Sequence, residues 1–127
     1  MLLTIQSHCK LGVVTNCSAR LGNLAAQRLG INWDTIVTSE EAGYYKPDPR
    51  PYERALHRLG VTPQETAFVA GSGFDMFGTA RTGLRTYWHN RVGMSLPPGA
   101  PPPEVESPTL DGVTHWLSQF QQSRTTS

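Results

Sequence analysis

Short apolar runs alternate with longer amphipathic segments along most of the chain. Each run has the length and the apolar character that are typical of a strand buried in a parallel sheet. The runs predict four strands, at Lys10–Asn16, Asp34–Ser39, Thr66–Gly71 and Leu84–His89.

The segments between these runs have the end signals of helices. Ser18 and Asp48 can each cap a helix, Pro49 suits a first helical turn, and a glycine follows each segment. The predicted helices are Ala19–Leu29, a helix from Pro49 to just before Gly60, and a helix over about Phe74–Thr82. The first helix has one mainly apolar stripe, formed by Leu21, Leu24, Ala25, Arg28 and Leu29, and the second has a stripe of Tyr52, Ala55, Leu56 and Leu59.

This alternation predicts an α/β fold built on a doubly wound parallel sheet, because parallel strands need crossover helices. We expect one partial core domain over residues 1–121, which starts with the last turns of a helix that ends near Cys9. Leu96–Pro108, with six prolines, is expected to be an extended linker before a helix near Leu110 to Phe120. Residues 122–127 are expected to be a disordered tail.

Composition narrows the classes of protein that fit this pattern. The 127 residues carry 11 basic and 10 acidic side chains, a net charge of +1, which gives no indication of a nucleic-acid or membrane-surface partner. No apolar run is long enough to span a bilayer. Cys9 and Cys17 lack the spacing of a zinc site or a disulfide framework, so we expect reduced thiols in a cytoplasmic protein.

Polar residues follow each predicted strand, and the carboxyl ends of parallel strands form the reactive edge of an open sheet. The candidates are Thr15 and Asn16 after the first strand, Lys46 after the second, Ser72 and Asp75 after the third, and His89, Asn90 and Arg91 after the fourth. Together they suit the binding of an anion and the stabilisation of charge that develops on it. Gly71 and Gly73 would let the backbone come close to the same point.

Each candidate also has a purely structural interpretation. Thr15 and Asn16 can form a capping turn, and Lys46 can be a solvated loop residue. Asp75 can be a first-turn acid that the helix dipole stabilises, and the residues around His89 can be a surface turn. The combination is more specific than any one member.

Four segments carry a resemblance to a known family. They are "VVTNCS", "YYKPDPRPYERAL", "FVAGSGFDMFGTARTGLRTYWHNR" and "TLDGV", and they cover the chain from about Leu11 to Leu117. They resemble the second half of the haloacid dehalogenase superfamily, a group with a Rossmann-like core, and within it the branch of L-2-haloacid dehalogenases of type II. A threonine that ends a strand, a Lys-Pro-Asp-Pro segment before a helix, and a strand followed by an acid occur here in the family's order.

The resemblance implies a role for each candidate. Thr15 matches a hydroxyl that binds the substrate anion or the transferred group. Asn16 matches a residue that helps to hold the substrate carboxylate or the product oxygen of the nucleophile. Lys46 matches the lysine that neutralises the nucleophile and the substrate, and we expect aromatic packing and the proline-started helix to place it. Asp75 matches the acid of the fourth motif, which orients groups or assists the hydrolytic water in dehalogenases. Ser72 stands where that branch usually has a substrate-binding asparagine.

The chain departs from the family's pattern in two ways. Gly71 stands where magnesium-dependent branches place a second acid, and Ala70 stands where dehalogenases usually have a serine. No Asp or Glu occurs before Asp34, so the nucleophilic aspartate, the first strand and the cap domain of the family are missing from this chain. A missing strand would leave an apolar edge exposed, which predicts a chain that is poorly stable alone, a homodimer, or a complementing N-terminal fragment.

The resemblance implies a hydrolase that acts on a small 2-haloalkanoic acid and breaks its carbon–halogen bond through an aspartate nucleophile. That reaction needs no cofactor. One alternative is a magnesium-dependent phosphatase of the same superfamily, in which Asp75 would hold the metal. The other is a non-catalytic remnant or an interaction module that keeps the fold.

Overall fold

The computed structural model describes residues 9–16, 18–28, 30 and 32–126. The chain divides into two compact units, Met1–Thr62 and Pro63–Ser127, and each is described by itself. The helix expected at the start of the chain lies outside the described residues, apart from Cys9. The single partial domain over residues 1–121 stays a prediction.

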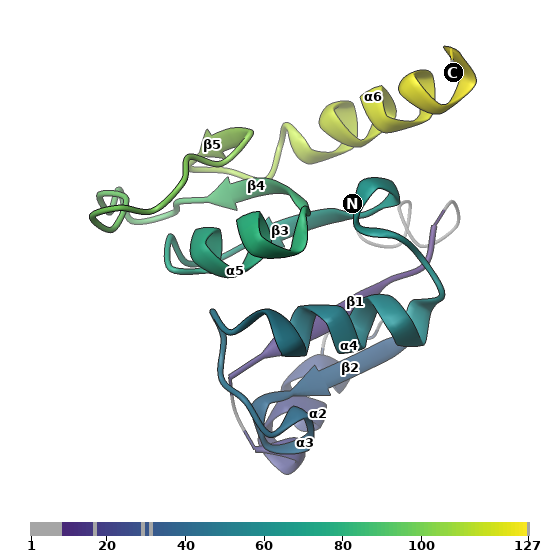
Figure 1. Cartoon of the computed structure of the whole chain (residues 1–127), viewed down its shortest axis with the longest axis vertical. Helices are drawn as coiled ribbons and strands as arrows, with labels where there is room; N and C mark the ends of the chain where they lie inside the picture. The colour runs from purple at the N-terminus through teal and green to yellow at the C-terminus, as the bar shows by residue number, and fades with distance from the viewer. Residues whose placement is uncertain (1–8, 17, 29, 31, 127) are drawn as a thin grey trace. The chain divides into compact units, whose positions relative to one another are not determined.

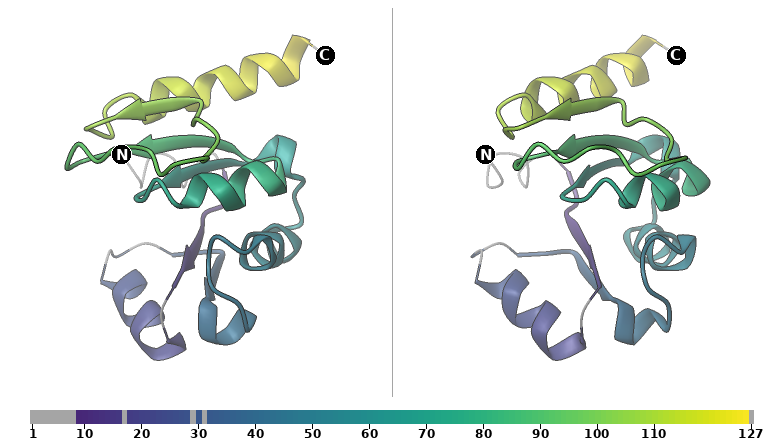
Figure 2. Two further views of the ribbon diagram at one scale, coloured as in Figure 1. Left: turned by 60° about the vertical axis from the view of Figure 1, so that its left-hand side comes forward. Right: turned by 90° about the vertical axis from the view of Figure 1, so that its left-hand side faces the viewer.

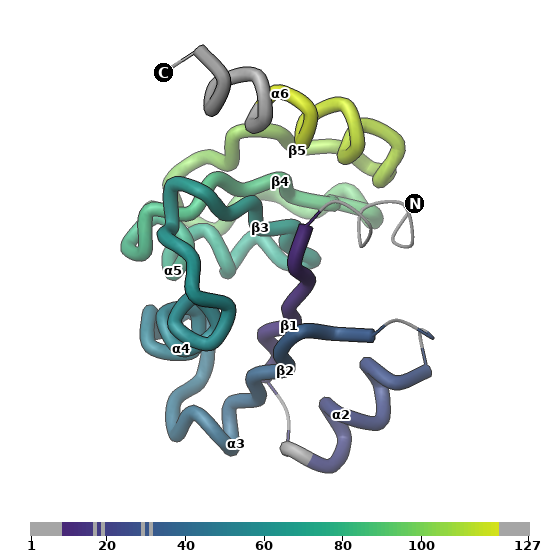
Figure 3. Tube along the Cα trace, turned by 90° about the vertical axis from the view of Figure 1, so that its right-hand side faces the viewer, coloured from purple at the N-terminus to yellow at the C-terminus, as the bar shows by residue number. Residues whose placement is uncertain are grey.

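The first unit has a two-stranded parallel sheet with a helix on each face (Figures 1 and 3). Its elements are β1 (Gly12–Thr15), α2 (Ala19–Gln27), β2 (Thr35–Thr38), α3 (Ser39–Ala42) and α4 (Pro49–Leu59). β1 pairs with β2 in a register that starts at Gly12 opposite Thr35 and ends at Thr15 opposite Thr38. Figure 3 shows α2 and α4 on opposite sides of these strands.

The ends of α2 and α4 follow the predicted capping chemistry. The Ser18 hydroxyl accepts a hydrogen bond from the Leu21 N–H at 3.2 Å, and the Asp48 carboxylate accepts one from the Arg50 N–H at 2.9 Å. Gly60 ends α4 in the left-handed conformation, with φ of 69°, which a residue with a side chain adopts at a cost. The predicted apolar stripe of α4 is buried at Tyr52 and its neighbours Ala55 and Leu56.

The side of α2 that packs inward differs from its apolar stripe. Leu21 is 62% exposed and Leu24 is 46% exposed, whereas Gly22 and Ala26 are buried. Small residues let the helix backbone lie close to its neighbours, so the inward face of α2 is its small-residue face. Leu21 and Leu24 of the predicted stripe are therefore surface residues of this unit, and Leu29 lies outside the described residues.

The second unit has a three-stranded parallel sheet in the order β3–β4–β5 (Figures 1 and 2). Its elements are the 3-10 helix η1 (Pro63–Glu65), β3 (Ala67–Ala70), α5 (Asp75–Thr82), β4 (Arg85–His89), β5 (Val105–Ser107) and α6 (Val113–Thr126). None of the helices in the described part of the chain is long and apolar enough to cross a membrane.

Two features of this unit differ from the expected pattern. β5 lies inside the proline-rich segment 96–108, which the sequence analysis expects to be an extended linker, and it is a fifth strand beyond the four that were predicted. The three residues of β5 contain no proline, and they pair with Tyr87, Trp88 and His89 of β4. The helix α6 continues to Thr126, through residues 122–126 that the sequence analysis expects to be a tail.

Neighbouring residues of β4 organise the two faces of the sheet, because successive side chains of a strand point to opposite faces. Trp88, 2% exposed, forms a buried cluster with Ala70 and Met76 of β3 and α5. Tyr87, 1% exposed, packs against Trp116 of α6 with ring centroids 5.6 Å apart. The α/β class with parallel sheets and helices on both faces is confirmed, although the predicted strands divide between two sheets.

One ion pair connects three segments of the second unit. The Arg85 Nε donates to a Glu104 carboxylate oxygen at 2.8 Å, its Nη2 donates to the other oxygen, and the Trp116 Nε1 donates to that second oxygen at 3.2 Å. The hydrogen bond from Arg85 is the main cause that lowers the pKa of Glu104, and the bond from Trp116 adds to it.

Replacement of Glu104 by Gln tests this connection. Because the pKa of Glu104 is lower in the folded state, its contribution is present above the unfolded pKa and is lost as the pH falls through the folded one. The pair is partly exposed, so we expect Glu104→Gln to lower the free energy of unfolding by about 0.5–1 kcal/mol at pH 7. The difference from the wild type should shrink at pH 3, measured by urea unfolding with tryptophan fluorescence.

Glu53→Gln removes an exposed carboxylate that forms no ion pair with any described residue, and it should change little. An equal loss at both pH values would contradict the assignment.

Candidate functional site

The carboxyl end of the first unit's sheet carries two threonines in register. Thr15 ends β1 and lies opposite Thr38, which ends β2. Thr38 is fully buried, and its hydroxyl accepts a hydrogen bond from the Glu41 N–H at 3.2 Å, so it caps α3. Thr15 is half-buried. The first candidate residue therefore ends its strand as the sequence predicts.

The amide of Asn16 is bonded to the backbone of Lys46. Its Oδ1 accepts from the Lys46 N–H at 2.7 Å, and its Nδ2 donates to the Lys46 carbonyl oxygen at 3.1 Å. This bridge spans 30 residues of sequence and fixes the backbone of the lysine to the end of β1. The structure thus brings Asn16 and Lys46 together, and Thr15 precedes Asn16 in the chain.

The placement of Lys46 by aromatic packing stays a prediction, and both of its aromatic neighbours are exposed. Tyr45 is 71% exposed, and the ring of Tyr44 lies under the guanidinium of Arg50, at 3.2 Å from its centroid. Arg50 also donates to both carboxylate oxygens of Asp48 at 2.9 and 2.7 Å. The Asn16 bridge holds the backbone of Lys46, and the Asp48 cap of α4 follows two residues later.

In the second unit, a tight turn joins β3 to α5. The Ser72 hydroxyl accepts from the Phe74 N–H at 3.2 Å, and the Asp75 N–H donates to the Ser72 carbonyl oxygen at 3.2 Å. Asp75 is the first residue of α5 and is 4% exposed. A buried acid in a first turn is stabilised by the helix dipole, so the structural interpretation of Asp75 and the catalytic one both fit its position.

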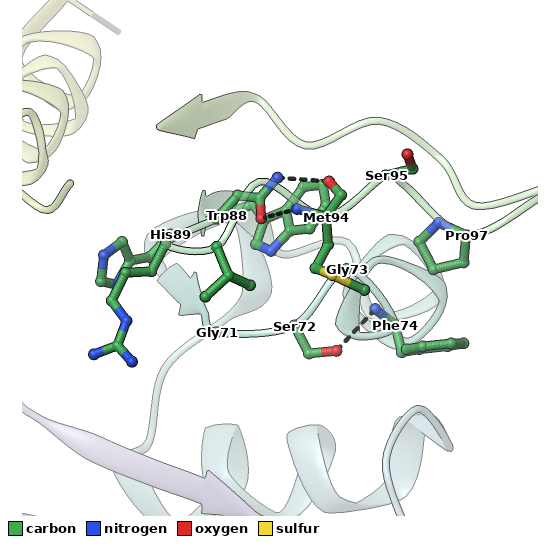
Figure 4. Close-up of a pocket in the computed structure, with 12 residues that line it drawn as sticks. Gly71, Ser72, Gly73, Phe74, Trp88, His89, Met94, Ser95 and Pro97 are labelled. Atoms are coloured by element: carbon green, nitrogen blue, oxygen red, sulfur yellow. Dashed lines mark hydrogen bonds between the residues drawn. The ribbon is translucent and has the colours of Figure 1, made fainter. Parts of the chain in front are cut away.

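A pocket with a volume of about 450 Å³ lies over this turn. Figure 4 shows the turn from Gly71 to Phe74 on one side and the segment from Trp88 to Pro97 on the other. Ser72 and the residues that follow β4 line it, including His89, Asn90 and Arg91. The polar residues that follow β3 and β4 therefore meet at one pocket, because these parallel strands are adjacent and end at the same edge.

The two glycines of the turn have different surroundings. A Cβ at Gly73 would lie 2.9 Å from the Pro97 Cδ and 3.0 Å from the Trp88 ring, whereas a Cβ at Gly71 would have no atom within 4 Å. Close approach requires glycine at position 73 alone. The close packing of Trp88 and Pro97 around Gly73 was not predicted, because the sequence analysis expects Gly71 and Gly73 alike to allow a close approach of the backbone.

Asp75 has no second carboxylate at this turn, because the residue four positions earlier is Gly71. The described part of the chain contains no group of three His, Cys, Asp or Glu side chains that could hold a metal ion. Magnesium prefers several oxygen ligands. The residues described around Asp75 thus do not by themselves fit a magnesium site.

The model of the family described as haloacid dehalogenase-like hydrolase matches residues 1–89. This chain belongs to the haloacid dehalogenase-like hydrolase family. The resemblance drawn from the four sequence segments is therefore confirmed.

Named relatives in the family differ in their chemistry. The chain is 35% identical over 97 residues to (S)-2-haloacid dehalogenase 4A of Burkholderia cepacia. The aligned residues cover 76% of this chain and 39% of that protein. The chain is 35% identical over 89 residues to a putative pyrophosphatase, PpaX, of Clostridium perfringens. The aligned residues cover 68% of this chain and 42% of that protein. The chain thus spans about two fifths of the length of these relatives.

A solved structure supports the same fold. The 2-haloacid dehalogenase from Pseudomonas syringae pv. Tomato DC3000 matches with a TM-score of 0.73 and 28% identity, over 87% of this chain and 47% of that one. The family's fold is therefore present in this chain. The roles of Thr15, Asn16, Lys46, Ser72 and Asp75, and their convergence at one edge, stay predictions.

Removal of the Asn16 amide tests whether it positions Lys46. Asn16→Ala should lose both hydrogen bonds, each with a net value of about 1 kcal/mol. We expect hydrogen exchange of the Lys46 amide to become about 5 to 30 times faster, as measured by NMR. Asn16→Asp keeps the acceptor for the Lys46 N–H and should retain most of the protection. Unchanged protection in Asn16→Ala would rule out the bridge as the positioning contact.

The two glycines offer a matched pair of variants. Gly73→Ala should lower the free energy of unfolding by about 1–3 kcal/mol, because the new methyl group overpacks the buried Trp88 ring. Gly71→Ala should be neutral or raise stability by up to about 1 kcal/mol, since it restricts the unfolded chain and meets no neighbour. Urea unfolding of both variants measures the difference. Equal effects of the two substitutions would contradict the packing described around Gly73.

Proposed function

We propose that this chain forms part of a hydrolase that removes halide from a small 2-haloalkanoic acid. The observation that carries the proposal is the bridge between Asn16 and Lys46, which holds the family's lysine beside the strand that ends in Thr15. The named similarity to (S)-2-haloacid dehalogenase 4A supports the choice of substrate class.

In this reaction an aspartate carboxylate attacks C2 of the substrate, a carbon–oxygen bond forms, and the carbon–halogen bond breaks to release halide. Water then hydrolyses the ester, which yields the 2-hydroxy acid, a proton and the free aspartate. The first 33 residues contain no Asp or Glu. We propose that the nucleophile comes from an N-terminal segment of the family that this sequence does not contain.

Lys46 would provide the positive charge that offsets the carboxylates of the nucleophile and the substrate. The Asn16 bridge fixes the backbone from which the Lys46 side chain extends. A positive charge close to the reacting carboxylates is an effective way to stabilise a transition state. Thr15 would donate its hydroxyl to the substrate anion, and Asp75 would orient the hydrolytic water. Ser72 would contact the substrate. Asn16 would contact the substrate in addition to its bridge to Lys46.

The strand edges support the idea of a complementing segment. Among the described residues, β1 pairs with β2 alone and β3 pairs with β4 alone. Unpaired edges of apolar strands favour association with another strand. The occupant would be a strand that carries the aspartate, and a second copy of the chain is the alternative. A cytoplasmic location belongs to the same proposal.

A magnesium-dependent phosphatase is the second candidate. The similarity to the putative pyrophosphatase PpaX and to a glyceraldehyde 3-phosphate phosphatase favours it. Gly71 weighs against it, because Asp75 then lacks a second carboxylate at the turn.

The test uses the 127-residue chain with and without a family N-terminal segment that carries the aspartate. We expect chloride release from (S)-2-chloropropionate by the combination and none by the chain alone. In the combination, Lys46→Met should lower kcat/KM by at least about 10²-fold, the size expected for a lost electrostatic contact in a transition state. Lys10→Met is the matched control, since it removes the only other lysine from the same unit.

The outcomes separate the candidates. Phosphate release from p-nitrophenyl phosphate with magnesium, without chloride release, would replace the dehalogenase by the phosphatase. A folded combination with neither activity would overturn both and favour an interaction module. Equal losses in Lys10→Met and Lys46→Met would assign the effect to folding.

A further inference from the structure

A second pocket, with a volume of about 300 Å³, lies in the second unit between α5, the start of β4 and the segment directly before β5. β4 and β5 are parallel, so their first residues lie at the edge of the sheet opposite to the one where Ser72 follows β3. No residue lines both this pocket and the pocket over the Gly71–Phe74 turn. The second pocket is therefore a separate feature of the same unit.

One wall of this pocket contains a hydroxyl group that has no protein partner. Thr79 of α5 is 2% exposed and lines the pocket, and its hydroxyl forms no hydrogen bond with any residue that the structure describes. Among the described residues, no side-chain oxygen or nitrogen is fully enclosed without a partner, so the Thr79 hydroxyl keeps a small accessible surface. The pocket is the opening that this residue borders. Buried polar groups are nearly always paired, so an unpaired hydroxyl at a pocket is one that a ligand can satisfy.

A second threonine adds a hydrogen-bond acceptor to the same pocket. Thr86 of β4 is 4% exposed, and its hydroxyl donates to the Leu84 carbonyl at 3.3 Å. Its oxygen can still accept, whereas the Thr79 hydroxyl can donate or accept. A ligand hydroxyl can thus accept from Thr79 and donate to Thr86.

The charges at the pocket cancel and are already bonded. Arg85 donates to both carboxylate oxygens of Glu104, and the indole of Trp116 donates to one of them. A charged ligand would have to displace one member of this pair and would leave the other without its partner, which is costly at a partly buried site. The pocket therefore favours an uncharged ligand.

The rest of the lining is apolar. Met76 and Leu84 are 2% and 9% exposed, and Pro102 and Pro103 come from the segment before β5. A methionine sulfur makes favourable contacts with the edge of an aromatic ring. The volume equals that of about ten water molecules in the liquid, so a molecule with one six-membered ring fits.

We propose that this pocket binds a small uncharged molecule with one apolar ring and one hydroxyl group, of which phenol is a simple example. The hydroxyl group pairs with Thr79 and Thr86, and the ring lies against Met76 and the two prolines. The site goes beyond the proposed reaction and does not depend on it, because it uses none of the candidate residues for halide removal.

The experiment is an NMR titration of the 15N-labelled 127-residue chain with phenol, toluene and benzoate. We expect phenol to shift the signals of Ala80, Thr86 and the Trp116 indole, and to leave those of Ser72 and Gly73 unchanged. Benzoate has the same ring with a charge, and it should bind at least about tenfold more weakly than phenol because it meets a carboxylate that is already paired.

Two threonine variants on one helix locate the hydrogen bond. Thr79→Val keeps the shape of the side chain and should weaken phenol by about threefold to tenfold, the size of one hydrogen bond, without weakening toluene. Thr82→Val is the matched control, since the Thr82 hydroxyl is outside the pocket lining and donates to the Gly78 carbonyl at 2.7 Å. It should change the affinity for phenol by less than about twofold.

A third variant tests the place of the ring without removing a hydroxyl. Ala80→Leu adds bulk at an exposed position of the lining and should weaken phenol and toluene alike, so it keeps the test open if Thr79→Val does not fold. Equal losses of phenol affinity in Thr79→Val and Thr82→Val, tighter binding of benzoate than of phenol, or shifts confined to residues outside the lining would overturn the proposal. Binding with the expected properties by a chain without turnover would support it while the proposed reaction fails.

Discussion

The second unit depends on two neighbouring side chains of β4 that are buried on opposite faces of one strand. Trp88 joins β3 and α5 into one layer, and Tyr87 joins α6 to the other. The hydroxyl of Tyr87 donates to the Thr109 carbonyl at 2.8 Å, so the aromatic ring is both packed and satisfied as a polar group. Because Trp88 also meets Gly73 closely, the packing of the sheet and the shape of the turn before Asp75 are set by the same ring.

The first unit shows a different way to position chemistry. A side-chain amide at the end of β1 fixes the backbone of Lys46 through two hydrogen bonds. The bridge joins Asn16, which directly follows β1, to Lys46, which lies between α3 and α4. The segments that carry the candidate residues Thr15 and Lys46 are thus joined through one asparagine and two hydrogen bonds.

Much of this architecture could be predicted from local chemistry. Ser18, Asp48 and Gly60 mark helix ends through contacts within a few residues, and apolar runs mark the strands at nearly their observed bounds. β5 could not be found in this way, because its pairing with β4 is long-range and prolines on both sides mask a three-residue strand. The buried face of α2 could not be predicted either, because a stripe of leucines gives no indication that the small residues Gly22 and Ala26 pack inward.

For the candidate residues, too, the positions could be predicted from the sequence but the contacts could not. Their positions after strands follow from the order of the chain, so Thr15, Lys46 and Asp75 could be predicted by place. Their contacts could not, because the partner of Asn16 is 30 residues away and the crowding at Gly73 comes from Trp88 and Pro97. The open space at Gly71 has a further meaning for the family. A Cβ at this position would have no atom within 4 Å. At this turn, the departure from the magnesium-dependent pattern of the family therefore lies at a position where the first atom of a side chain meets no neighbour.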